Sequence, residues 1–324
     1  MFYGTIRGHY QHVPSTSQPL FKAVYPMTQK FTDRLNALWQ YPLPHHVLSR
    51  AIYKATRIQA KPVKNALIRA AIRHFDIDMS LAAEQDINAY PHFNSFFTRT
   101  LRADARPVCQ GENEIACPVD GAISQLGDIS NGRIFQAKGH DYSLEALVGG
   151  YRHLHDEFDG GKFATIYLSP RDYHRIHMPL SGKLREVIYI PGRLFSVNAA
   201  TTRAIPGLFA RNERLVAVFD TEIGPMAVIL VAAIFVAGIE TVWSGNFGDD
   251  MFRKFQHWNH AGDPHLPQVT LGKGEEMGRF NMGSTVILLF GKNKMNWDAQ
   301  AKTNATVQMG QKLGLFAEQP LKRP

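Results

Sequence analysis

Short apolar runs separated by glycine and proline dominate the chain after about residue 105. Runs of four to eight residues rich in valine, isoleucine and aromatic residues are typical of strands, and such punctuation is typical of turns. This texture predicts a mostly antiparallel β domain. Its expected strands are Phe163–Leu168, Leu184–Ile190, Leu215–Phe219, Met226–Val231, Ile234–Ile239 and Thr285–Phe290.

Two of these strands come from one long apolar run, Ile223–Ile239, which has 17 residues between two glutamates. A membrane-spanning helix needs about 20 apolar residues, so the run is marginal for a span. Pro225 and Gly238 near its ends, and its valine and isoleucine content, favour two buried strands. The spanning helix is the alternative.

The first third of the chain follows a different period. Residues 1–20 read as a flexible tail, and residues 21 to about 105 read as helical, broken by Pro42, Pro44 and Pro62. The predicted fold class is therefore α+β, with an N-terminal amphipathic helical region (21–105) before a β-rich catalytic domain (106–324). The spacing i, i+3, i+4, i+7, i+8 of one helix stripe is seen in Val63, Ala66, Leu67, Ala70 and Ala71.

Charge is concentrated in the helical region. The formal net charge is +8, and from Arg34 to Phe75 there is no acidic residue. An excess of base favours an acidic partner, and apolar helices with a basic face are typical of helices that lie on anionic lipid. An ordinary solvated basic face is the alternative. The basic residues of this stretch are Arg34, Arg50, Lys54, Arg57, Lys61, Lys64, Arg69 and Arg73.

Candidate chemistry begins at Gly283-Ser284, just before the predicted strand at 285–290. A hydroxyl directly after a glycine can attack the glycine carbonyl if a base removes its proton. An ordinary turn before a strand is the alternative, because Gly-Ser is common in turns.

Two histidines offer such a base. Ser169-Pro170 and Asp172 predict the start of a short helical turn, which would place His174 and His177 on the same side. Two imidazoles can serve as base and acid near neutral pH, and Asp120 could orient one of them. A metal pair or two surface histidines are the alternatives. No metal is expected, since no full ligand set is apparent and Cys109 and Cys117 form no C-x-x-C motif.

Longer segments resemble the bacterial type of phosphatidylserine decarboxylases, in order over about residues 21 to 315. They are FNSFFTRTLRADARPV (93–108), CPVDGAIS (117–124), FATIYLSPRDYHRIHMPLSG (163–182), LFSVN (194–198), LFARNERLVAVFDTEIGPMAVILV (208–231), IETVWSG (239–245) and EMGRFNMGST (276–285).

The resemblance implies a self-cleaving proenzyme that converts phosphatidylserine to phosphatidylethanolamine and CO2. Cleavage between Gly283 and Ser284 would give chains 1–283 and 284–324 and turn Ser284 into a covalent pyruvoyl group, which forms a Schiff base with the substrate. It implies that Asp120 and His177 assist self-cleavage and that His174 handles substrate. The departures are Met282, where the family usually has leucine, and Ala199, where many members have histidine.

The resemblance also implies partners and a location. These are a heterodimer of the two cleavage chains, often dimerised further, no nucleic acid, and peripheral attachment to anionic phospholipid on the cytoplasmic face of the bacterial inner membrane. Three other functions remain open: a serine hydrolase using Ser284, His177 and Asp120, a non-catalytic membrane-binding protein, and a pyruvoyl decarboxylase of small amines. The serine hydrolase is disfavoured because the G-x-S-x-G elbow is missing.

Overall fold

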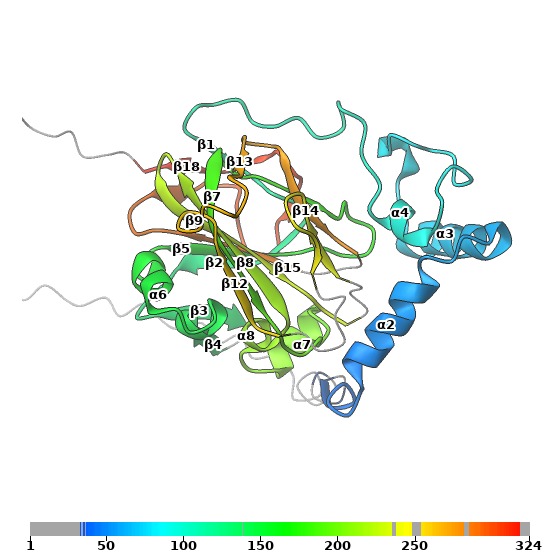
Figure 1. Cartoon of the computed structure of the whole chain (residues 1–324), viewed down its shortest axis with the longest axis horizontal. Helices are drawn as coiled ribbons and strands as arrows, with labels where there is room; N and C mark the ends of the chain where they lie inside the picture. Colours follow the sequence, from blue (N-terminus) through cyan, green and yellow to red (C-terminus); the bar gives the residue numbers. More distant parts are fainter. Residues whose placement is uncertain are drawn as a thin grey trace, which may run out of the picture.

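The computed structural model describes residues 33, 35, 37–137, 139–234, 238–247, 254–281 and 285–317. Figure 1 shows the β-rich core with helices α2, α3 and α4 gathered on one side of it. The helices are α2 (His45–Ala55), α3 (Lys61–Phe75), α4 (Phe93–Phe97), α5 (Leu144–Leu147), α6 (Arg152–Phe158), α7 (Ala199–Ala204) and α8 (Leu208–Arg211), with the 3₁₀ turn η1 (Met79–Leu81).

The described strands form antiparallel sheets, as the apolar pattern predicts. The largest sheet has nine strands in the order β12-β7-β8-β9-β15-β5-β2-β17, with β13 paired to β7. Its strands are β2 (Gly121–Asp128), β5 (Lys162–Tyr167), β7 (Gly182–Ile190), β8 (Arg214–Thr221), β9 (Gly224–Val231), β12 (Gln256–Asn259), β13 (Thr270–Leu271), β15 (Thr285–Phe290) and β17 (Thr306–Val307).

Three smaller sheets complete the described core. A four-stranded sheet has the order β11-β10-β14-β6, β1 and β16 flank β18, and β3 pairs with β4. These strands are β1 (Glu114–Ala116), β3 (Arg133–Ala137), β4 (His140–Ser143), β6 (Arg175–His177), β10 (Ile239–Thr241), β11 (Gly245–Phe247), β14 (Glu276–Phe280), β16 (Met295–Trp297) and β18 (Lys312–Phe316).

Five of the six predicted strands agree with β5, β7, β8, β9 and β15 to within two residues at each end, because runs of buried β-branched residues mark central strands. The strand β15 coincides with the predicted Thr285–Phe290, and all six of its residues are fully buried. The predicted strand Ile234–Ile239 is wrong at its start, since Ile234 lies in a turn and only Ile239 opens a strand. Residues 235–237 of that prediction lie outside the described part of the chain.

The helical region has a small core of its own, separate from the main one. Apolar side chains from α3, α4 and the loop between them form it, namely Ile68, Ala71, Ile77, Tyr90, Phe93, Phe96 and Phe97. The prediction of a helix around 63–71 is confirmed, but α3 buries a different face from the expected stripe. Lys64 is buried, and its ammonium donates to Asn65 Oδ1 and to the carbonyls of Ile87 and Asn88. Val63 and Leu67 are instead exposed.

No described helix combines the length and apolar character needed to cross a bilayer.

Candidate active site

The site lies where several strands of the large sheet end together. Ala122 at the start of β2 pairs with Tyr167 at the end of β5, and Tyr167 also pairs with Thr285 at the start of β15. Asp120, two residues before Ala122, and Thr285, which follows Ser284 in the chain, therefore lie at the same end of the sheet. Gly121 permits this close pairing, since a Cβ there would lie 2.3 Å from the Tyr167 carbonyl oxygen.

The histidine segment crosses the same end. The His177 N–H donates to the Pro118 carbonyl at 2.9 Å, and the Phe280 N–H donates to the His174 carbonyl at 3.0 Å. Strand β6 is thus held between the loop carrying Asp120 and strand β14, which leads into the cleavage segment. The structure brings the three predicted segments together; Met282, Gly283 and Ser284 themselves lie outside the described residues.

The predicted helical turn over 169–177 is wrong beyond its first residues. Asp172 accepts from the Ser169 N–H and hydroxyl at 2.7 and 2.8 Å, so a turn forms. The chain then extends into β6, because pairing with β14 satisfies its backbone groups. His174 lies just before this strand; its ring packs on Phe97, whereas the His177 ring contacts the Tyr173 hydroxyl and the Gly274 carbonyl, so the two rings have different surroundings.

His177 carries a basic nitrogen whose identity follows from its partners. Its Nδ1 lies 2.7 Å from the Gly274 carbonyl oxygen, which can only accept, so the neutral ring is protonated there. Its Nε2 therefore carries the lone pair and accepts a hydrogen bond from the Tyr173 hydroxyl at 3.0 Å. Burial lowers the pKa of His177 below its ordinary value, against the opposing effects of the Gly274 hydrogen bond and the Glu276 charge. His177 is therefore neutral and able to take a proton at neutral pH.

Asp120 is held by a different partner from the predicted one. The Arg106 guanidinium binds its carboxylate with Nε at 2.9 Å and Nη2 at 2.5 Å, and the Met309 N–H donates to it at 2.8 Å. None of the hydrogen bonds among described residues joins Asp120 to the His177 ring. The charge of the carboxylate nevertheless raises the pKa of His177, by less than burial, the Gly274 hydrogen bond and the Glu276 charge change it.

His174 is fully buried, and one ring nitrogen has no partner among the described residues. Its Nδ1 donates to the Asp172 carbonyl at 2.8 Å, and its ring packs on Phe97 with centroids 4.1 Å apart. Its Nε2 is the unpartnered atom. Burial lowers the pKa of His174 to about 3, so the ring is neutral with a free lone pair. Thr285 Oγ1 is also buried and has no hydrogen-bond partner in the part of the chain that the structure describes.

Three residues of this site escaped the sequence analysis: Arg106, Tyr173 and Thr285. Burial raises the pKa of Tyr173 to about 12, which keeps its phenol protonated beside His177. Each of the three stands inside or next to a segment that resembles the family, at ADARPV, RDYHRIH and MGST. The sequence indicates these residues only by their position within those segments. It does not indicate which side chains they contact.

No group of three or more metal-ligating side chains was found among the described residues.

The large family model described as phosphatidylserine decarboxylase matches residues 93–315, and a second, described as PSD, matches residues 35–76. The chain belongs to the phosphatidylserine decarboxylase family. Similar proteins named phosphatidylserine decarboxylase proenzyme include those of three bacteria. The Azotobacter vinelandii protein is 53% identical over 87% of this chain and 98% of its own length. Those of Bordetella bronchiseptica and Idiomarina loihiensis are each 49% identical over 91% and 89% of this chain, and 98% of their own lengths.

Proposed function

We propose that this chain decarboxylates phosphatidylserine after cutting itself between Gly283 and Ser284. The observation that carries the proposal is the convergence of the Asp120 loop, the His177 strand and the start of β15 at one end of the large sheet. Membership of the phosphatidylserine decarboxylase family supports the same activity.

Self-cleavage needs a base, a nucleophile and a carbonyl. The Ser284 hydroxyl takes the place of the Tyr173 hydroxyl at His177 Nε2 and gives its proton to that nitrogen. Its Oγ attacks the Gly283 carbonyl and replaces the amide by an ester. Loss of the Ser284 α-proton then breaks the ester and frees the Gly283 carboxylate. Water replaces the nitrogen as ammonia and leaves the ketone. Asp120 stabilises the imidazolium through its charge, since Arg106 and the Met309 N–H fix its position.

The two product chains would stay together without a covalent bond. Strand β15 belongs to chain 284–324 and lies between β9 and β5, which belong to chain 1–283. Strand β18 of the same short chain pairs with β1. Separating the chains would expose the fully buried β15, so we expect one folded heterodimer.

The residues around this point fit a pyruvoyl group derived from Ser284. The buried, unpartnered Thr285 Oγ1 and His174 Nε2 are polar atoms that such a group and its substrate could satisfy. The group would supply an electrophilic carbonyl that captures the serine amine and draws electrons as CO2 leaves. The neutral His174 ring has a free lone pair at Nε2, which can accept a hydrogen bond from the substrate.

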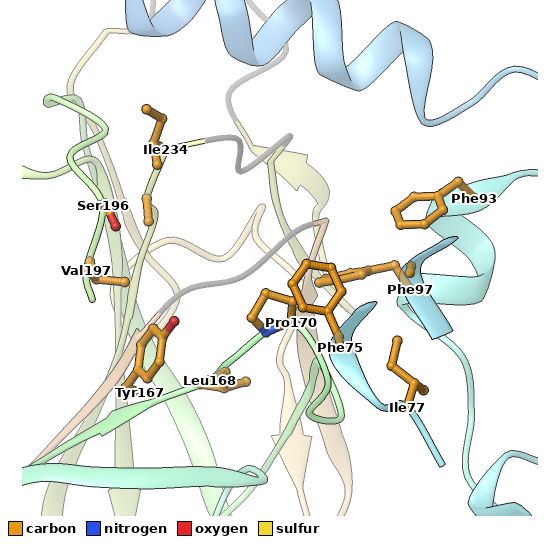
Figure 2. A pocket seen from close by; sticks show the side chains of 12 residues that line it. Phe75, Ile77, Phe93, Phe97, Tyr167, Leu168, Pro170, Ser196, Val197 and Ile234 are labelled. Carbon is orange, nitrogen blue, oxygen red and sulfur yellow. The ribbon is translucent and has the colours of Figure 1, made fainter. Parts of the chain in front are cut away.

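An apolar cavity of about 260 Å³ lies beside these residues and would receive part of the lipid. Figure 2 shows Phe75, Phe93 and Phe97 of the helical region on one side, facing Tyr167 and Ile234 of the core. Its walls connect to the reacting groups, because Tyr167 pairs with Thr285 and Phe97 packs on His174. A cavity of this character suits an acyl or glycerol portion rather than a free amino acid.

The helical region presents apolar side chains to solvent, which supports docking on a membrane. Nine of the twelve exposed large apolar side chains in the described residues fall between Leu35 and Phe75, so exposure of this kind is concentrated there. Phe75 belongs both to this surface and to the cavity wall. Exposed basic residues on the same helices, such as Lys54, Arg69 and Arg73, favour anionic lipid. Attachment to the cytoplasmic face of the inner membrane and homodimerisation remain part of this proposal.

Replacing Val63 and Leu67 together by serine should weaken binding to phosphatidylserine vesicles. The two side chains are 42% and 40% exposed, and losing their contact with lipid costs about 2 kcal/mol at ~25 cal/mol per Å², roughly 30-fold in affinity. Vesicle sedimentation measures this loss. The matched control is Phe135→Ser, which removes a similarly exposed apolar side chain from β3, outside the helical region. Equal weakening by both variants would contradict docking through α3.

The activity itself is tested by following CO2 release from the purified protein. We expect release from phosphatidylserine vesicles and little from free serine or small amino acids. The reverse preference would support a decarboxylase of small amines. Ester hydrolysis without CO2 by an uncut chain would support the serine hydrolase.

A further inference from the structure

Asn281, the residue that follows β14, is fully buried with hydrogen bonds at both ends of its side chain. Its Oδ1 accepts from Asn94 Nδ2 at 2.8 Å, and its Nδ2 donates to Glu240 Oε1 at 2.7 Å. Its backbone N–H donates to the Gly238 carbonyl at 3.0 Å. Three directional bonds in a buried setting fix this residue far more firmly than a turn at the surface.

Asn281 stands close to the proposed cleavage site in the chain, so fixing its position also constrains the bond to be cut. It stands three residues before Ser284, and only residues 281–284 connect β14 to β15. Strand β14 is paired on both sides, to β10 and β6, and β15 is paired on both sides, to β9 and β5. The bond to be cut therefore belongs to a four-residue connection between strands of two sheets. Asn281 is the first residue of that connection, directly after β14.

Asn94, the residue that donates to Asn281, belongs to helix α4. The Asn94 N–H donates to the Thr56 carbonyl just after α2, and Phe97 of the same helix packs on the His174 ring. Asn94 Oδ1 is buried and has no partner among the described residues, which leaves one acceptor available at this point. One short helix of the N-terminal region thus contacts both the entrance to the cleavage segment and a residue of the site.

We propose that Asn281 is a positioning residue for self-cleavage, held in place by Asn94 of α4. This rests on the proposed cut at Gly283-Ser284. Attack of a hydroxyl on the preceding carbonyl requires the two atoms to be oriented closely, and a misplacement of about 1 Å can cost about 10²-fold in rate. Asn281 acts through the backbone direction it imposes and takes no part in the bond changes.

The test follows the cutting of newly made full-length chain in cell-free synthesis, read as the half-time of cleavage on denaturing gels. Asn281→Ala should lengthen the half-time about 10²-fold. Asn94→Ala should lengthen it less, because it removes one of the two side-chain bonds. Glu240→Gln keeps an oxygen acceptor for Asn281 Nδ2 and should cut within about twofold of the wild type.

A merely structural role is separated by a matched control and by a second readout. Asn65→Ala also removes a buried asparagine whose Nδ2 donates to another asparagine at 2.8 Å, here Asn88 within the helical region. It should lower the unfolding temperature and leave the cleavage half-time unchanged. Once cut, the Asn281 and Asn94 variants should release CO2 at nearly the wild-type rate per cleaved molecule.

The proposal is overturned if the Asn281 and Asn94 variants cut with the wild-type half-time, or if Asn65→Ala slows cutting as much as they do. Should Asn281→Ala fail to fold, the Asn94→Ala half-time decides, since that residue lies outside the cleavage segment. A wild-type chain that stays uncut would instead contradict the proposed function. That result is distinct from any outcome for the variants, because it is read on the wild-type chain alone.

Discussion

Replacing Ser284 by alanine should leave the chain in one piece and abolish CO2 release. Alanine has no hydroxyl to attack the Gly283 carbonyl, so neither the cut nor the ketone that depends on it can form. Denaturing gels and trapped CO2 measure the two losses. Both should fall below detection, because the remaining residues cannot replace a covalent step.

The control is Ser284→Cys, which keeps a nucleophile at the same position. It should still cut, more slowly than the wild type. An alanine variant that released CO2 from phosphatidylserine would contradict the assignment of the reactive group to Ser284.

The second large effect is expected at His177. Its replacement by alanine removes the base at the point where Nε2 accepts from Tyr173, and general base catalysis typically contributes about 10²–10⁴-fold. The half-time of cleavage should lengthen by that factor. His257→Ala is a matched control, since His257 of β12 is a half-buried histidine that binds Glu186 of β7.

The same residue sets an expected pH dependence. Burial lowers the pKa of His177 below its ordinary 6.5, so the ring stays neutral to lower pH than a free histidine. The cleavage rate should be flat from neutral pH upward and fall only as pH drops through that lowered pKa. The fold follows the same sign: protonation favours the unfolded chain, so the stability of the neutral buried ring is lost as pH falls. A midpoint above 6.5 would contradict His177 as the base.

Sequence patterns located β5, β7, β8, β9 and β15 because most residues of these central strands are buried. Thr285–Phe290 has no polar residue after Thr285, and its burial is complete along its length. The helix around 63–71 was found for a similar reason, but its buried face was not. Lys64 faces inward because three oxygen acceptors from Asn65 and the 87–88 segment receive its ammonium, a tertiary arrangement that a periodic pattern does not contain.

The histidine segment shows how local signals fail against pairing. Ser169, Pro170 and Asp172 do form a turn, as their side chains indicate. The following residues become β6 because β14, about a hundred residues later, supplies their partners. Asn281 was missed for the same cause, since its partner Asn94 lies 187 residues away. Arg106 binds Asp120 only 14 residues later, but no sequence pattern indicates that this pair meets.

The most direct test of the account is the mass of the purified protein under native and denaturing conditions. The native species should have the mass of the two chains together, and denaturation should release chains 1–283 and 284–324. The short chain should be lighter than one starting with an intact serine by the mass of one ammonia, because a pyruvoyl group stands in place of that serine. A protein that releases CO2 from phosphatidylserine while remaining a single chain through Gly283-Ser284 would contradict it.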